Sequence, residues 1–151
     1  MTIKFFKILV VAICFFILQN VLELIFMSIL AKLGITYMDV EVRGESFVDV
    51  IEGISLYYFY WQLLYAAPVY LVLIIAFLLY LFRNKEISFK NIAIIHLVVS
   101  LLVFLVLWFA FGNGFTFIVN PLLGLLLAAG LIYLLASQFK KPLIKYKAIT
   151  A

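Results

Sequence analysis

The side chains best suited to chemistry lie close together in the first apolar segment of the chain. Gln19, Asn20 and Glu23 are three or four residues apart, a spacing that places them on one face of a helix. Glu23 lies about 13 Å along that helix from Lys32, in the outer part of a membrane span. An ionised carboxylate in hydrocarbon is costly, so Glu23 must be protonated, paired or in contact with water.

Partners at a similar depth can come from the outer end of the next apolar segment. Gln62 and Tyr65 share a helix face there and offer an amide and a phenol. We therefore predict a polar pocket that opens outward, with Glu23 as its ionisable member and Gln19, Asn20, Gln62 and Tyr65 around it. Two interpretations stay open: a hydrogen-bonded clamp between helices, or a site that binds a ligand, a cation or a proton.

His96 is the single histidine of the chain. It lies about 9 Å along the third apolar segment from Lys90, whereas Glu23 lies near the opposite membrane face. The two side chains should not touch in a simple antiparallel bundle, which argues against an acid–base pair. Ser100, four residues later, is the expected helical neighbour of His96, and we interpret this histidine as a satisfied buried or interfacial residue.

The chain carries no recognisable catalytic or cofactor motif. There is no Gly-x-Ser-x-Gly sequence, no Cys–His pair and no phosphate-binding loop. The single cysteine, Cys14, cannot form an internal disulfide. The five acids of the first connection match no calcium-binding loop. We therefore expect no metal and no cofactor.

Long apolar segments must position these residues. Of the 151 residues, 69% are hydrophobic and 12% are charged, and the mean hydropathy is +1.30. Soluble domains average about 45–50% apolar and about 25% charged residues, so the composition predicts a protein that has lipid as its solvent. Four segments, about residues 5–31, 55–82, 91–111 and 121–139, are long enough to span a bilayer.

We predict an all-α membrane protein, a single domain in which four transmembrane helices form an antiparallel bundle of two helical hairpins. In the outer acidic loop, residues 32–54, a capping-box pattern is followed by apolar residues at helical spacing. A short amphipathic interfacial helix is expected there. Aromatic residues 57–61 are typical of a belt at the membrane surface, with a surface that stacks on a ligand as the alternative. Pro68 predicts a kink in the second span.

Basic residues indicate the orientation in the membrane. Nine of the eleven lysines and arginines lie before span one, between spans two and three, or after span four, and short basic connections stay in the cytoplasm. Both termini are therefore expected to be cytoplasmic, in what we interpret as a bacterial inner membrane. The basic residues that give the net charge of +4 do not form a basic face on a folded domain, so nucleic-acid binding is not expected. The lysines after span four are placed to meet anionic lipid headgroups.

Gly124 and Ala128 form a small-xxx-small pair on span four, which allows another helix to approach closely. We assign this face to packing within the chain, with self-association as the alternative. The sequence favours a non-catalytic accessory or scaffold subunit that packs against a larger membrane protein or itself. A small transporter or ligand-binding module built on the Glu23 pocket is the alternative. An intramembrane enzyme comes third, because it needs two or more facing catalytic groups.

Overall fold

The computed structural model describes residues 2–33, 48, 62–81, 86–111, 119–139 and 143–145. Four α-helices account for most of these residues: α1 (Thr2–Lys32), α3 (Ala67–Leu81), α4 (Phe89–Phe111) and α5 (Val119–Gln138). A short π-helix, η1 (Gln62–Ala66), leads directly into α3. The prediction of a helical chain with four main helices is confirmed. Apart from Val48, which is helical and exposed, the expected interfacial helix and aromatic belt lie outside the described residues.

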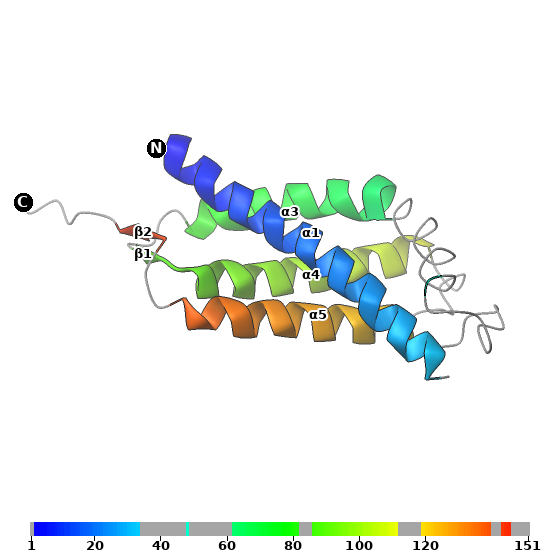
Figure 1. The fold of residues 1–151 in the computed structure, drawn as a ribbon. Coiled ribbons are helices and arrows are strands. Elements are labelled where there is room, and N and C mark those ends of the chain that lie inside the picture. Colours follow the sequence, from blue (N-terminus) through cyan, green and yellow to red (C-terminus); the bar gives the residue numbers. More distant parts are fainter. Residues whose placement is uncertain are drawn as a thin grey trace, which may run out of the picture.

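Successive helices run in opposite directions, so the start of α1, the end of α3, the start of α4 and the end of α5 share one end of the bundle (Figure 1). Helix α4 lies between α3 and α5 and contacts both. Helix α1 crosses obliquely over the other three and contacts each of them (Figure 1). This oblique course decides which side chains of α1 meet α4 and α5.

Two helices are long and apolar enough to cross a membrane, over Lys4–Leu30 and Phe89–Ala110. Among the described residues the other two apolar helices are shorter, Leu63–Leu79 and Leu122–Gln138. By length and composition, the structure therefore supports two candidate membrane-crossing helices. That all four helices cross the membrane stays a prediction.

The irregularity expected at Pro68 takes the form of a change in helix type. The chain is π-helical up to Ala66 and α-helical from Ala67. Pro68 has no N–H to donate to the Leu64 carbonyl, so the α-helical ladder is interrupted at this turn. Helices commonly bend at prolines and at π turns, and here the two coincide.

A side-chain cap marks the start of α4. Ser88 directly precedes the helix, and its Oγ accepts a hydrogen bond from the Asn91 N–H at 3.2 Å. The Ser88 carbonyl accepts a further bond from the Ile92 N–H, also at 3.2 Å. A serine at this position satisfies a backbone donor that the first helical turn leaves without a partner. The helix consequently begins at Phe89, slightly before the predicted span.

A short strand pairing, not predicted from the sequence, lies at the same end of the bundle. Strands β1 (Glu86–Ile87) and β2 (Ile144–Lys145) are antiparallel, with Ile87 opposite Ile144. The Leu143 N–H also donates to the Ile87 carbonyl at 2.9 Å. Two such strands would be marginal in isolation, but Ile87 is fully buried. Its burial helps to hold the segment after α5 against the connection before α4.

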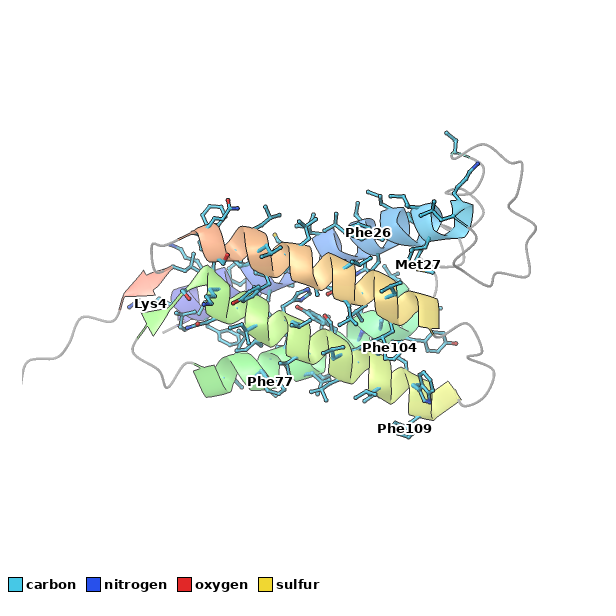
Figure 2. The ribbon with its side chains drawn as sticks, turned by 90° about the horizontal axis from the view of Figure 1, so that it is seen from below. Lys4, Phe26, Met27, Phe77, Phe104 and Phe109 are labelled. Carbon is cyan, nitrogen blue, oxygen red and sulfur yellow. The ribbon has the colours of Figure 1, made fainter. Side chains whose placement is uncertain are left out.

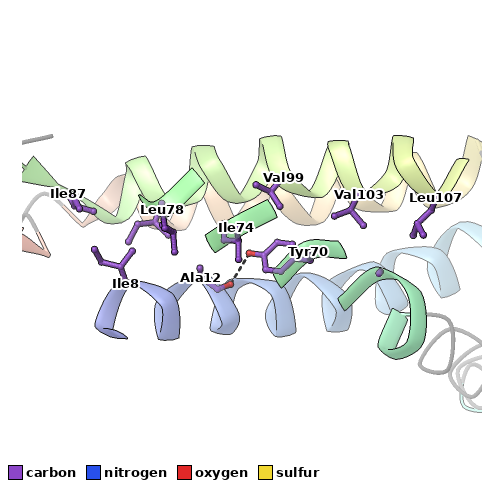
Figure 3. Close-up of a cluster of buried hydrophobic side chains, with 11 residues drawn as sticks. Ile8, Ala12, Tyr70, Ile74, Leu78, Ile87, Val99, Val103 and Leu107 are labelled. Carbon is purple, nitrogen blue, oxygen red and sulfur yellow. Dashed lines mark hydrogen bonds between the residues drawn. The ribbon is translucent and has the colours of Figure 1, made fainter. Parts of the chain in front are cut away.

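The main apolar core lies between α1, α3 and α4. Ile8 of α1 and Ile74 and Leu78 of α3 are fully buried there, together with valines of α4 (Figure 3). Helix α5 packs mainly through smaller residues, and its Ala136 belongs to a second cluster with Ala93 of α4. Small side chains allow the close helix approach that packing in an apolar solvent requires.

The outer surfaces of the helices are apolar as well. Large hydrophobic side chains are exposed on every helix, for example Phe6, Val72, Phe109 and Leu134, and Figure 2 shows Phe109 projecting away from the bundle. The buried polar or charged side chains of the described residues are Gln19, Glu23, Ser28, His96 and Ser100. Polar groups inside and apolar groups outside are the distribution expected for a protein in lipid.

Candidate functional site

Gln19, Glu23 and Ser100 form a hydrogen-bonded group between α1 and α4, which we call the polar triad. Glu23 and Gln19 are only 3% and 4% exposed. Gln19 Nε2 donates to Glu23 Oε1 at 2.7 Å, and Ser100 Oγ donates to Gln19 Oε1 at 2.9 Å. The Gln19 amide therefore connects a carboxyl group on its own helix to a hydroxyl group on the neighbouring helix.

The two bonds of the polar triad use complementary ends of the Gln19 amide. Its NH₂ group faces an oxygen that accepts, and its carbonyl oxygen faces a hydroxyl that donates. A hydrogen bond to a charged group contributes about 1.5–3 kcal/mol to stability, against about 1 kcal/mol for a neutral one. The polar triad is thus able to fix the rotation of α1 relative to α4.

Helix α5 packs against the same part of α1. Gly124 is buried, and a Cβ atom at this position would lie 3.3 Å from Met27 Cγ and 3.8 Å from the Glu23 carbonyl oxygen. Ala128, one turn later, is fully buried. In this structure Gly124 therefore meets another helix of the same chain, at the turn that carries Glu23.

The remaining residues of the predicted pocket are placed differently. Asn20 is half-buried, and its Nδ2 donates to the Phe16 carbonyl of its own helix at 2.7 Å. Tyr65, in η1, is 37% exposed. The side chain of Gln62 lies outside the described part of the structure. The structure thus joins Gln19 directly to Glu23, and the outward opening of the pocket stays a prediction.

A second buried polar group connects α1, α3 and α4. The Tyr70 hydroxyl lies 2.7 Å from His96 Nδ1 and 3.1 Å from the Ala12 carbonyl oxygen, and Figure 3 shows the bond to Ala12. All three residues are buried. The ring centroids of Phe15 and His96 are 5.9 Å apart, and those of Phe16 and Tyr70 are 4.3 Å apart. Aromatic rings from α1 thus pack beside both polar side chains.

From the sequence we predicted neither the bond of Ser100 to Gln19 nor the role of Tyr70, although a feature of the sequence pointed to each. Ser100 is predicted as a neighbour of His96, but its hydroxyl bonds to Gln19. Gln19 and Ser100 lie at similar distances from the C-terminal ends of α1 and α4, which indicates that they lie at a similar level of the bundle. Tyr70 lies in the apolar interior of α3, where its hydroxyl needs a partner.

Together, the two groups bring an acid, an amide, a hydroxyl, a phenol and an imidazole into the core of the bundle. Groups of these kinds donate or accept hydrogen bonds, and a carboxyl group and an imidazole are also able to bind and release a proton. Within the described residues, no cluster of three His, Cys, Asp or Glu side chains is placed to hold a metal ion. No protein-family model matches the chain, and no significant match was found to a curated protein or to a solved structure.

Proposed function

We propose that the chain is a small integral membrane protein with four transmembrane helices that acts as a non-catalytic accessory or scaffold subunit of a membrane complex. The observation that carries this proposal is the distribution of polarity, with buried polar side chains inside and large apolar side chains exposed on every described helix. Water solvates such an exterior poorly. Such an exterior packs favourably against lipid tails or against the apolar face of another membrane protein.

The hydrogen bonds of the interior support a scaffold role. The polar triad joins α1 to α4, and Tyr70 joins α3 to both of them. Interhelical hydrogen bonds of this kind help to hold helices together where the hydrophobic effect does not act between them. A bundle fixed in this way presents a constant outer surface, as an assembly subunit must.

We further propose that both termini are cytoplasmic and that the protein resides in a bacterial inner membrane. The start of α1 and strand β2 share one end of the bundle (Figure 1). Lys4, Lys7 and Lys90 are exposed in the turns of α1 and α4 at that end. A concentration of basic residues at one end supports a cytoplasmic location for it.

Purification of the tagged protein from its native membrane in a mild detergent tests the subunit proposal. We expect a second membrane protein to co-purify in a fixed ratio, measured by mass spectrometry of the intact complex, because the apolar exterior offers a large surface for assembly. A complex made only of copies of this chain would support the self-associating form of the proposal. Recovery of a folded monomer alone would contradict it.

A second function, a small transporter or ligand-binding module, is favoured by the burial of a carboxyl group in the bundle. The Glu23→Gln variant separates the two functions, since glutamine keeps the shape and can accept the bond from Gln19 but carries no charge. We expect stability in detergent to change by less than about 1 kcal/mol and co-purification of the partner to persist. The measurement is thermal unfolding of parent and variant, with and without added cations. If cations stabilise the parent but not the variant, the transporter function replaces the scaffold function.

A further inference from the structure

The Tyr70 hydroxyl contacts two groups but carries a single hydrogen. A backbone carbonyl only accepts, so the contact with Ala12 at 3.1 Å requires Tyr70 to donate that hydrogen. We therefore assign the contact with His96 Nδ1 at 2.7 Å as a bond in which Nδ1–H donates to the Tyr70 oxygen, a role that depends on the tautomer of the ring. In a neutral ring with its proton on Nδ1, Nε2 carries a free lone pair.

His96 Nε2 is buried without a compensating bond. The residue is 0% exposed, and Nε2 has no hydrogen-bond partner among the described residues. A buried acceptor without a donor destabilises the fold, so its presence needs an explanation. An imidazole nitrogen with a free lone pair is a base, and binding a proton is the chemistry it offers.

The polar triad lies one helical turn from this base. Ser100 and His96 are four residues apart on one face of α4, and both are buried. The Ser100 hydroxyl donates to Gln19, and the Gln19 amide donates to Glu23. Both bonds therefore run in the same direction, away from His96 and toward a carboxyl group. A row of dipoles with this direction favours a positive charge at its His96 end.

We propose that His96 Nε2 is a proton-binding site inside the bundle and that the polar triad stabilises its protonated form. The proton comes from hydronium in the bulk, the neutral imidazole becomes imidazolium, and the Nδ1–H bond to Tyr70 is retained. The only bond formed is Nε2–H, and water is the other product. This site is independent of the scaffold function, because co-purification of a partner does not require His96 to bind a proton.

The helices around His96 carry ionisable groups of both signs. Helix α3 carries Tyr70 and Tyr80, α5 carries Tyr133, and α1 carries the buried Glu23 together with Cys14 and lysines 4, 7 and 32, which are exposed. On α4 itself, Lys90 lies over the Tyr133 ring, with Nζ 5.9 Å from its centroid. Glu23 is the one carboxylic acid in the described part of these four helices, so it is the group that can supply a stabilising negative charge.

NMR of the protein labelled at the histidine nitrogens tests the first half of the proposal, because the chain has one histidine. At neutral pH we expect a proton on Nδ1 and none on Nε2. Tyr70→Phe removes the hydroxyl that holds this tautomer and should produce a mixture of tautomers. Tyr133→Phe, on α5, is the matched control and should keep the parent spectrum. A parent protein with its proton on Nε2 at neutral pH would overturn the proposal.

Acidification tests the contribution of the polar triad. Glu23 is about 12 Å along α1 from Phe15, the residue whose ring contacts His96. An ionised carboxyl group at about this distance, with an effective dielectric constant of about 20, changes a protonation equilibrium about tenfold. At a fixed pH at which Glu23 is ionised, Glu23→Gln should therefore lower the ratio of protonated to neutral His96 about tenfold. Ser100→Ala removes the first hydrogen bond of the polar triad but keeps the carboxyl group of Glu23. It should therefore lower the ratio of protonated to neutral His96 by less than Glu23→Gln does.

Ser28→Ala is the matched control for these variants. Ser28 is fully buried on α1, and its hydroxyl donates to the Leu24 carbonyl of the same helix at 2.8 Å. The ratio of protonated to neutral His96 should therefore stay at the parent value, while circular dichroism verifies that each variant remains folded. Equal ratios in Glu23→Gln and Ser28→Ala would overturn the proposal. So would a parent protein that stays folded on acidification while Nε2 never gains a proton.

Discussion

Replacing Gly124 with leucine is expected to lower the free energy of unfolding by about 2–3 kcal/mol. The space beside this residue is already filled, since a Cβ atom there would lie 3.3 Å from Met27 Cγ and 3.8 Å from the Glu23 carbonyl oxygen. Leucine adds three carbon atoms beyond Cβ, so the Met27 side chain must shift or α5 must move away from α1. The measurement is thermal or denaturant unfolding of the purified protein in detergent.

Gly130 provides a matched control on the same helix. A Cβ atom at this position would have no neighbour within 4 Å, so a leucine there meets open space. Because glycine in a helix interior costs about 1 kcal/mol relative to good helix formers, Gly130→Leu should be neutral or slightly stabilising. If the two leucine variants unfolded at the same temperature, close packing of α5 on α1 at Gly124 would be ruled out.

Replacing Gln19 with leucine is the second change for which a large effect is expected, a loss of about 2 kcal/mol in the free energy of unfolding. The substitution removes the donor to Glu23 Oε1 at 2.7 Å and the acceptor of the Ser100 hydroxyl at 2.9 Å. Both of these groups are buried, and a buried polar group that loses its partner keeps its full desolvation cost. Unfolding in detergent, under the same conditions as for Gly124→Leu, measures the loss.

The double variant Gln19→Leu, Glu23→Leu distinguishes a lost bond from lost packing. Removing both partners also removes the buried carboxyl group that has lost its bond from Gln19, so the double variant should be more stable than Gln19→Leu alone. Ser28→Ala loses a bond within its own helix and should cost less than Gln19→Leu. Strict additivity of the two leucine substitutions would show that Gln19 and Glu23 are not energetically coupled.

The sequence alone determined the helices and the local half of the candidate site. Apolar stretches of this length have few stable alternatives to a helix, because each backbone polar group needs a partner when lipid replaces water. The bond between Gln19 and Glu23 joins residues four apart on one helix. Such contacts follow from the helical repeat alone, so they need no knowledge of the other helices.

The partners across helices were decided by the tertiary structure. Ser100 of α4 meets Gln19 because α1 crosses the other helices obliquely (Figure 1), whereas His96 of α4 meets Tyr70 because α3 packs beside α4. The tilt and rotation of a helix result from many weak contacts summed over its length, including the close approach of Gly124 to Met27. A linear sequence gives the depth of each residue along its own helix. Which face each helix turns toward its neighbours depends on the packing of all of them at once.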